Sequence, residues 1–410
     1  MARGRRRGGQ ARAAPALTAL PPRSAADILR AAHLGEGATL SSYDIAVIGG
    51  GLVGSATAYG LARQGARVIV LDEGDIALRA SRANFALVWV QGKGDGMPEY
   101  AAWARLSAEI WHELAAELKE TTGVDVFHGK PGGLKFVLDT EEKQAYGAQL
   151  ERIRSAASPP GFEYEFLDRK ALHNLVPPLG PDVMGAYYSP HDGHCNSLFL
   201  LRALHAGLLK RGGTYRPHSK VDDIERAGSA FAVRVGSQRI HAGRVVLAAG
   251  HGNVPLAPKV GLDVPIKPSR GQVMVTERFA PMLRYPTHLI RQTAEGSFMM
   301  GDTKEDVGFD VGTTLNGMQK IGATAIRVFP FLARARIVRV WSGIRIMPPD
   351  GFPIYDQSRS HPGAFTVNCH SGVSLAAAHV LRLAPYLAKG ALPDSMSCFS
   401  AQRFLIRRAA

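Results

Sequence analysis

The chain has 410 residues, of which 46% are hydrophobic and 20% charged, and its formal net charge is +14. This length predicts two domains, and this composition is typical of a globular protein. No stretch approaches the eighteen apolar residues of a membrane span, and the three cysteines lack the spacing of a disulfide framework or a metal site. Scattered cysteines suit a reducing compartment, so we expect a cytoplasmic protein.

Residues 1–42 are rich in Ala, Arg, Pro and Gly and show no period. They hold seven arginines but only Asp27 and Glu36 as acids, so five of the fourteen excess charges lie there. We expect a disordered basic leader or an extension from an upstream start codon, and an organelle-targeting peptide is the minor alternative. The other excess charge is spread out, which predicts a solvated surface and no nucleic-acid partner.

Residues 43–73 show the pattern of a dinucleotide-binding βαβ unit. An apolar run at 45–48 leads into a glycine turn and an Ala-rich helical stretch, and a second apolar run at 67–71 ends in Asp72. The glycines stand at the offsets that the motif requires: Gly49, Gly51 and Gly54. They permit a tight turn, a close backbone approach to a pyrophosphate, and close packing of helix on strand. The helix N-terminus faces the diphosphate, and Asp72 is placed to bind ribose hydroxyls.

Hydrophobic periodicity predicts the later elements in chain order. They are a helix at 99–122, a strand and helix start at 131–142, a loop at 176–190, a helix at 198–210, hairpin strands at 214–248, a strand at 244–250, a proline-rich crossover at 255–268, strands at 271–279, 287–293 and 296–310, a helix at 315–328, strands at 336–341 and 364–368, and a helix at 379–389. Mononucleotide-type segments thus lie at both ends and in the middle of the chain.

We therefore expect an α/β fold of mixed α+β character. A Rossmann-like, nucleotide-binding domain is interleaved with a mainly antiparallel-sheet substrate domain, and the cleft between them is the expected site. The predicted limits are 43–130, 185–255 and 340–410 for the first domain, and 131–184 and 256–339 for the second.

Two further segments carry patterns typical of a ligand site. In RVVLAAG (244–250), Ala249 and Gly250 leave room for a cofactor to pass close to the backbone. In WSGIRIMPPDGFPI (341–354), Arg345 follows Gly343 and precedes a rigid proline turn. A fixed guanidinium is suited to bidentate binding of a carboxylate, although a surface or salt-bridged arginine is the simpler alternative.

CHSGVSLAAAHV (369–380) predicts a strand end, a glycine turn and a helix start. Backbone N–H groups of this turn and the helix dipole can stabilise negative charge on a ligand. The residues concerned are Gly372, Val373 and Ser374. We expect His370 to position this loop in preference to acting as a base.

SRAN (81–84) offers Ser81, Arg82 and Asn84 as a second phosphate-contacting group, with an ordinary polar loop as the alternative. The motifs occur in one order along the chain: GGGLVG with Asp72, SRAN, DGHCN (192–196), VVLAAG, PSRGQ (268–272), GIRIMPPDG (343–351) and HSGVSLA (370–376). Together they resemble the D-amino-acid oxidase/sarcosine oxidase superfamily of FAD-dependent amine oxidoreductases. SRANFALVWVQGKG, GHCN and NCHSGVSLAAAH are most similar to the FAD-bearing β subunits of opine oxidases and D-hydroxyproline dehydrogenases.

The resemblance implies FAD extended across the first domain, with the isoalloxazine at the domain interface and the turn at 372–374 over its pyrimidine ring. It also implies that Arg345 binds the substrate carboxylate. The candidate catalytic residues are Arg345, Arg291 and His370, and no metal is expected. The candidate cofactor-binding residues are Gly49, Gly51, Leu52, Val53, Gly54, Asp72, Glu73, Ser81, Arg82, Asn84, Ala249, Gly250, Gly343, Gly372, Val373 and Ser374.

Three residues depart from the family pattern. Ala86 stands where many relatives carry glycine, so we expect a slightly displaced backbone there. Met299 stands in place of a lysine that assists oxygen reduction in the sarcosine-oxidase branch, which favours a dehydrogenase. Cys369 does not match the cysteine that carries FAD in several relatives, so we expect noncovalent FAD.

The expected reaction is oxidation of the C–N bond of a D-amino acid, an N-substituted amino acid (opine) or hydroxyproline by hydride transfer to flavin N5. Dioxygen, a quinone and an iron–sulfur partner subunit all stay open as electron acceptors, and the resemblance implies a hetero-oligomer. Two alternatives stay open as well. One is an NAD(P)-dependent dehydrogenase, and the other is a non-catalytic or RNA-associated flavoprotein subunit.

Overall fold

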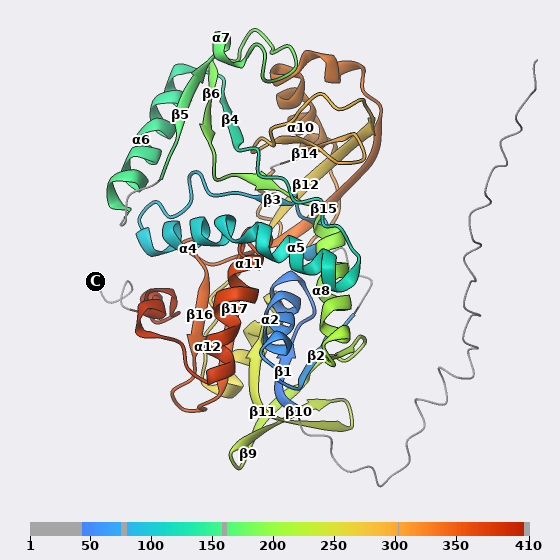
Figure 1. Ribbon diagram of the computed structural model, residues 1–410, viewed down its shortest axis with the longest axis vertical. Coiled ribbons are helices and arrows are strands. Elements are labelled where there is room, and N and C mark those ends of the chain that lie inside the picture. Colours follow the sequence, from blue (N-terminus) through green and yellow to red (C-terminus); the bar gives the residue numbers. More distant parts are fainter. Residues whose placement is uncertain (1–42, 75–79, 158–161, 302, 406–410) are drawn as a thin grey trace, which may run out of the picture. The chain divides into compact units, whose positions relative to one another are not determined.

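Helices and strands from several parts of the chain form the walls of the site. The computed structural model describes residues 43–74, 80–157, 162–301 and 303–405, so the expected leader at 1–42 lies outside the described residues. The described residues form one compact unit. Within the described ranges the largest sheet has eight strands (Figure 1). They are β1 (Tyr43–Ile48), β2 (Val68–Leu71), β8 (Thr214–Arg216), β9 (Asp223–Ala227), β10 (Ala230–Val235), β11 (Gln238–Leu247), β16 (Ile354–Gln357) and β17 (Ala364–Asn368).

The order of this sheet is β16-β17-β11-β1-β2-β8, and β9 and β10 extend it as an antiparallel hairpin beside β11. β1 pairs in parallel with both β2 and β11, and β17 is parallel to β11. The carboxyl ends of these four strands therefore meet at one edge. This edge brings together chain segments that are more than 300 residues apart, and it confirms the predicted Rossmann-like core.

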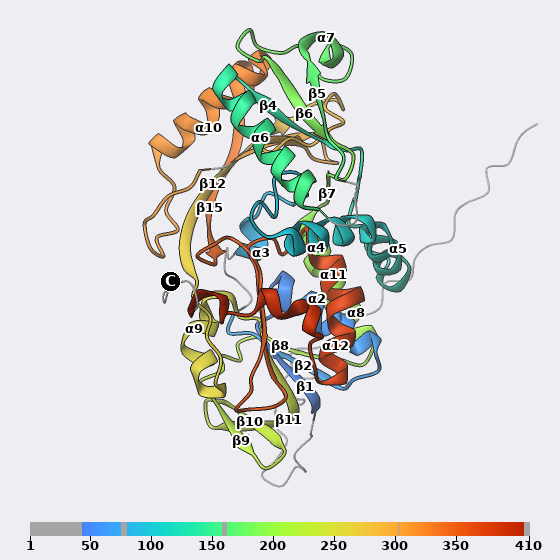
Figure 2. The ribbon, with the colours of Figure 1, turned by 90° about the vertical axis from the view of Figure 1, so that its left-hand side faces the viewer.

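Helices cover this sheet on one face. α2 (Leu52–Arg63) lies with α8 (Ser197–Lys210), α11 (Ala376–Ala378) and α12 (Ala384–Lys389) on that face, and α9 (Asn253–Leu256) lies on the other (Figure 2). Glycine lets α2 approach its neighbours closely, because a Cβ at Gly60 would lie 2.7 Å from the carbonyl oxygen of Val380. Ten of the twelve residues of α2 are consequently buried.

Two smaller antiparallel sheets lie in the upper half of Figure 1. One has the order β13-β14-β12-β15 and the other β4-β6-β5, and β3 pairs with β7 separately. Their strands are β3 (Leu87–Val88), β4 (Gly133–Val137), β5 (Glu165–Asp168), β6 (Gly185–Ser189), β7 (Gly193–His194), β12 (Lys267–Arg278), β13 (Ile290–Gln292), β14 (Ser297–Gly301) and β15 (Ile337–Met347). Buried aromatic residues such as Phe136, Phe298 and Phe329 join the two sheets in one core. The predicted interleaving with an antiparallel-sheet region is thus confirmed.

The remaining helices lie between or beside these sheets. They are α3 (Ala80–Ala83), α4 (Pro98–Glu109), α5 (Trp111–Thr122), α6 (Thr140–Ala156), α7 (Arg169–Leu172) and α10 (Leu315–Val328). The single helix expected at 99–122 is two helices that break at Ile110, and the helix expected at 379–389 begins with a π-helical turn at His379–Leu383.

One expected loop is wrong in part. The segment 176–190 contains β6, whose GAYYS sequence pairs with β4 and β5 and buries all but one residue. The glycines and prolines before it suggested a loop, but its two tyrosines favour a strand, and it lies between two others. The division into two domains stays a prediction, and we propose to place β6 and all of β15 in the substrate domain because their strand partners lie there.

Candidate active site

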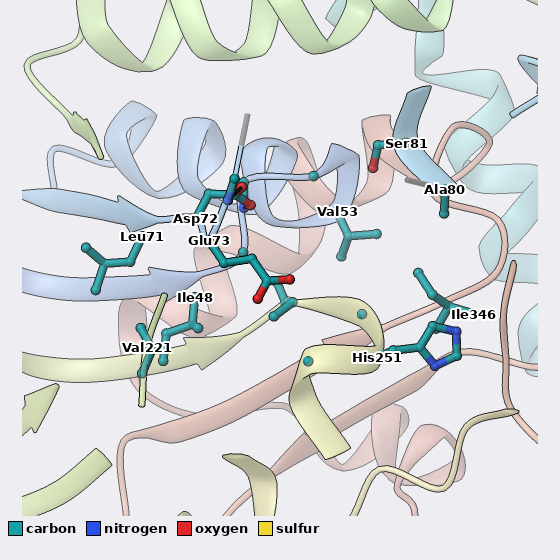
Figure 3. Close-up of a pocket in the computed structure, with 18 of the residues that line it drawn as sticks. Ile48, Val53, Leu71, Asp72, Glu73, Ala80, Ser81, Val221, His251 and Ile346 are labelled. Carbon is teal, nitrogen blue, oxygen red and sulfur yellow. Dashed lines mark hydrogen bonds between the residues drawn. The ribbon is translucent and has the colours of Figure 1, made fainter. Parts of the chain in front are cut away.

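A cavity of about 980 Å³ opens at the carboxyl edge of the large sheet. It is lined by the ends of β1, β2, β11 and β17 and by the segment between β8 and β9. Figure 3 shows Asp72 and Glu73 at its centre, with Val221 on one side and Ser81 and Ile346 on the other. A crevice at this edge of a doubly wound sheet is the usual place for a dinucleotide.

The predicted glycine turn has the geometry that such a ligand needs. Gly49 has φ +105°, and a Cβ there would lie 2.5 Å from Cα of Ala249. A Cβ at Gly54 would lie 1.9 Å from the carbonyl oxygen of Gly49, so the helix can begin this close to the turn only without a side chain. Among the described residues, the backbone N–H groups of Gly51 and Val53 have no acceptor, which leaves them available to a phosphate.

Asp72 and Glu73 bring two carboxylates to the end of β2. Asp72 accepts hydrogen bonds from the backbone nitrogen of Gly50 at 2.7 Å and from that of Gly74 at 3.0 Å, so it fixes the loop across from it. Both acidic residues line the cavity, and each carboxylate has four lone-pair sites. They therefore fit a ribose at this end of the cavity.

The SRAN loop lies against the start of α2. Ser81 Oγ accepts the backbone N–H of Leu52 at 2.8 Å, and both Ser81 and Arg82 line the cavity. The side chain of Asn84 bonds to its own loop, donating to the carbonyl of Ser81 and accepting from the nitrogen of Ala86. Ala86 has φ +63°, so the departure from glycine is accommodated by a left-handed alanine.

A second cavity of about 350 Å³ lies beside the first. Arg345, His370 and the turn at 372–374 line it together, as do Gly343, Leu52 and Asn84. The two cavities share wall residues, so they lie side by side. The shared residues are Val53, Ala80, Ser81, Ile344, Ile346 and Cys369. Ala249 and Gly250 line the first cavity only.

Hydrogen bonds to neighbouring segments hold the turn at 372–374, and its backbone N–H groups are left without acceptors among the described residues. Trp111 Nε1 donates to the carbonyl of Val373 at 3.0 Å, and Ser374 Oγ accepts from the nitrogen of Trp89 at 3.0 Å and donates to the carbonyl of Leu87. No described residue accepts a hydrogen bond from the backbone N–H groups of the turn itself. These three donors can therefore meet a partly negative group in the second cavity.

Arg345 projects from β15 across β12. Its Nη1 donates to the carbonyl of Arg270 at 3.1 Å, and the missing side chain of Gly271 makes room, since a Cβ there would lie 2.3 Å from Nη2 of Arg345. The guanidinium is thus oriented by the backbone of the neighbouring strand. Its place in the second cavity suits a carboxylate ligand.

The other two catalytic candidates differ from each other. His370 lines the second cavity, where desolvation by the surrounding protein lowers its pKa and the charges of Lys93, Arg345 and Lys304 add to the effect. It is therefore neutral at physiological pH. Arg291 does not line either described cavity; its guanidinium donates to the carbonyl of Phe85 at 2.7 Å and contacts the sulfur of Met299.

Sequence reasoning missed several residues of the site. His205 and Tyr215 line the first cavity beside the glycine turn, with ring centroids 4.3 Å apart, and Lys93, His288 and Lys304 line the second. A lysine between two glycines in VQGKG was the one available signal for Lys93. Among the described residues, no cluster of three His, Cys, Asp or Glu side chains could hold a metal ion.

The fold and the site define a class: proteins with a dinucleotide site at the sheet edge and an arginine in the wall of the adjacent cavity. Comparison with known proteins gives the family. The family of FAD dependent oxidoreductases called DAO matches residues 44–383, and the chain belongs to this family. FAD fits the glycine turn, with its N–H groups that lack acceptors among the described residues, and the two adjoining cavities.

Relatives and solved structures agree with this membership. The chain is 43% identical to an opine oxidase subunit of Agrobacterium tumefaciens over 366 residues, which cover 89% of this chain and 99% of the relative. It is 29% identical to glycine oxidase of Pseudomonas putida over 80% of this chain and 89% of that protein. The crystal structure of glycine oxidase from Geobacillus kaustophilus shares the fold, with a TM-score of 0.81, 24% identity and coverage of 88% and 98%.

Proposed function

We propose that this FAD-dependent oxidoreductase oxidises the C–N bond of an amino-acid-type substrate in the second cavity. The observation that carries the proposal is that Arg345 and the turn at 372–374 line one cavity, which shares wall residues with the nucleotide cavity. FAD, when bound, supplies the group that accepts a hydride at N5 from the carbon next to the substrate nitrogen.

The chain's own residues bind and orient. Arg345 holds the substrate carboxylate with two parallel hydrogen bonds, which fixes the direction of the Cα–H bond. The three N–H groups of the turn at 372–374 would hold the partly negative pyrimidine end of the flavin when FAD is bound. His370 is neutral and offers a hydrogen bond without taking up a proton at pH 7, because its pKa is about 3.

The cofactor is bound noncovalently. Cys369 lies at the junction of the two cavities, and burial raises the pKa of its thiol to about 12. The thiolate is the nucleophilic form of cysteine, so this side chain is poorly suited to attack a flavin. Denaturation with acid is expected to release all the FAD into the supernatant, and yellow colour retained in the precipitate would count against this point.

An N-substituted amino acid of the opine type is the first substrate we propose, because the 43% identical relative is named as an opine oxidase subunit. D-Amino acids and hydroxyproline are the alternatives. That relative is named as a subunit, which supports a hetero-oligomer. A partner subunit, a quinone or dioxygen would accept the electrons. The free state of Cys195, Cys369 and Cys398 supports a cytoplasmic location. No helix among the described residues is long and apolar enough to cross a membrane.

The test is anaerobic bleaching of the bound flavin by a substrate panel of opines, D-amino acids, sarcosine and hydroxyproline epimers. We expect at least one opine to bleach the flavin band completely. Family membership already favours FAD over the nicotinamide alternative. If no compound of the panel bleaches the flavin, while salt-dependent retention on nucleic acid survives removal of residues 1–42, the basic-surface alternative is the better one.

A further inference from the structure

Lys93 is a cation at the wall of the second cavity that the proposed reaction does not use. Its Nζ donates to Ser371 Oγ at 2.6 Å and to Ser374 Oγ at 3.3 Å. These two serines enclose Gly372 and Val373, so the lysine contacts both ends of the turn whose N–H groups are open to the cavity. The hydroxyl of Tyr100 shares a further hydrogen bond with Ser371 at 3.0 Å.

The loop that carries Lys93 is fixed by Asp192. The buried carboxylate accepts hydrogen bonds from the backbone nitrogens of Val90 and Gln91 and from Gln91 Nε2 at 2.6 Å. Gly94 has φ +82°, and a Cβ there would lie 2.4 Å from the nitrogen of Ala101. This gives the DGHCN motif a physical role, because it holds the loop in the one conformation that directs Lys93 to the turn.

Lys93 keeps its charge in this environment. Burial lowers the pKa of its ammonium to about 8, and the carboxylate of Asp192 acts in the opposite direction. At pH 7 the ammonium form therefore predominates. No described carboxylate forms an ion pair with Lys93, and Ser371 and Ser374 meet its ammonium with neutral hydroxyl groups. The charge thus remains available to a ligand in the cavity.

Hydride transfer creates the charge that such a cation can stabilise. A hydride carries one proton and two electrons, so the ring system that receives it gains one negative charge, and the substrate that loses it becomes an iminium ion. The negative charge gathers at the pyrimidine end of the flavin, where the turn at 372–374 is placed by the proposed function. A fixed positive charge behind that turn favours the reduced state, because it needs no reorganisation when the charge appears.

We propose that Lys93 is a positioning residue that raises the reduction potential of the flavin by placing its ammonium, through Ser371 and Ser374, behind the turn at Gly372. This inference rests on the proposed placement of the flavin ring. If Lys93 were purely structural, an uncharged hydrogen-bond donor in its place would serve equally well. Substitution can therefore separate the role of the charge from that of the hydrogen bonds.

The experiment is a reductive titration of the FAD-loaded protein against a reference dye at pH 7. Lys93→Gln keeps donors for the two serines but removes the charge, and we expect it to disfavour reduction at least tenfold, which is about 30 mV for a two-electron couple. Lys93→Arg keeps the charge and is expected to differ from wild type by less than threefold. Lys304→Met is the matched control, since it removes another cation from the same cavity but leaves the hydrogen bonds of Lys93 to Ser371 and Ser374 in place.

Three results would overturn the inference: an unchanged potential in Lys93→Gln, an equal loss in Lys93→Arg, or an equal loss in Lys304→Met. If Lys93→Gln does not retain FAD, Ser371→Ala and Ser374→Ala are titrated in its place, and each is expected to lower the potential. The titration uses a chemical reductant and no amino acid. A shifted potential without bleaching by any substrate would therefore reject only the proposed function, and bleaching without a shift would reject only the role of Lys93.

Discussion

Ser81 Oγ lies 2.8 Å from the backbone nitrogen of Leu52, although the two residues are 29 positions apart. This hydrogen bond ties the SRAN loop to the start of α2, where helices have N–H groups without intrahelical acceptors. Ser81 satisfies one of these groups and leaves its neighbours open to the cavity. The loop therefore supports the nucleotide site by capping a helix as well as by lining the wall.

Loss of this cap is expected to weaken both the fold and the cofactor site. Ser81→Ala should lower the free energy of unfolding of the FAD-free protein by about 1 kcal/mol, which is typical of a lost N-cap side chain. The affinity for FAD should fall as well, since the glycine turn loses a support. Urea unfolding and FAD titration measure the two effects. Ser155→Ala, on an exposed position of α6, is the control, and equal behaviour of the two variants would contradict the capping role.

Arg345→Ala is expected to remove a charged hydrogen-bonding partner of the substrate without removing the cofactor. A loss of about 1.5–3 kcal/mol in transition-state binding corresponds to a fall of roughly 10- to 150-fold in kcat/KM. Arg345→Lys should recover only part of this, because an ammonium cannot form the bidentate pair. Steady-state kinetics with an artificial electron acceptor and the FAD content of each variant provide the measurement. Unchanged kcat/KM in Arg345→Ala would rule out the carboxylate role.

Ala86 is expected to tolerate glycine unusually well. Its φ of +63° costs about 1–2 kcal/mol in an alanine, and glycine removes this strain at the expense of some packing and chain entropy. We expect Ala86→Gly to lie within about 0.5 kcal/mol of wild type or to be more stable. Ala104→Gly, in the interior of α4, is the control and should cost about 1 kcal/mol or more. Chemical unfolding of both variants measures their free energies of unfolding, and an equal loss of stability in the two would contradict the strained conformation of Ala86.

Buried histidines predict a loss of stability at acid pH. His379 is fully buried, its Nε2 lies 2.8 Å from Tyr355 Oη, and burial lowers its pKa to about 3, against about 6.5 in an unfolded chain. Between these values the unfolded state binds more protons, so the stability that is present above pH 6.5 decreases as the pH falls. In His379→Gln the slope of the free energy of unfolding against pH should decrease by about 1.4 kcal/mol per pH unit. Urea unfolding between pH 4 and 6.5 measures it, and an unaltered slope would refute the assignment.

Local patterns in the sequence predicted much of the fold. The helix at 315–328 and the strand at 364–368 have the expected bounds, because each shows a clear period and is bounded by turn residues. The helix at 99–122 was too long, since its apolar period continues across the break at Ile110. β6 was missed because its neighbours β4 and β5, which provide its partners, lie in other parts of the chain.

The sequence by itself determined the nucleotide-binding turn. Gly49 has a positive φ, and the backbone next to Gly54 leaves no room for a side chain, so both positions require glycine. Only the tertiary structure decided which side chains surround the reactive end of the cavity. Lys93 reaches Ser371 across 278 positions, and Arg291, a candidate catalytic residue, is directed to the carbonyl of Phe85. Such contacts depend on how distant strands meet at one sheet edge, and no local pattern encodes that meeting.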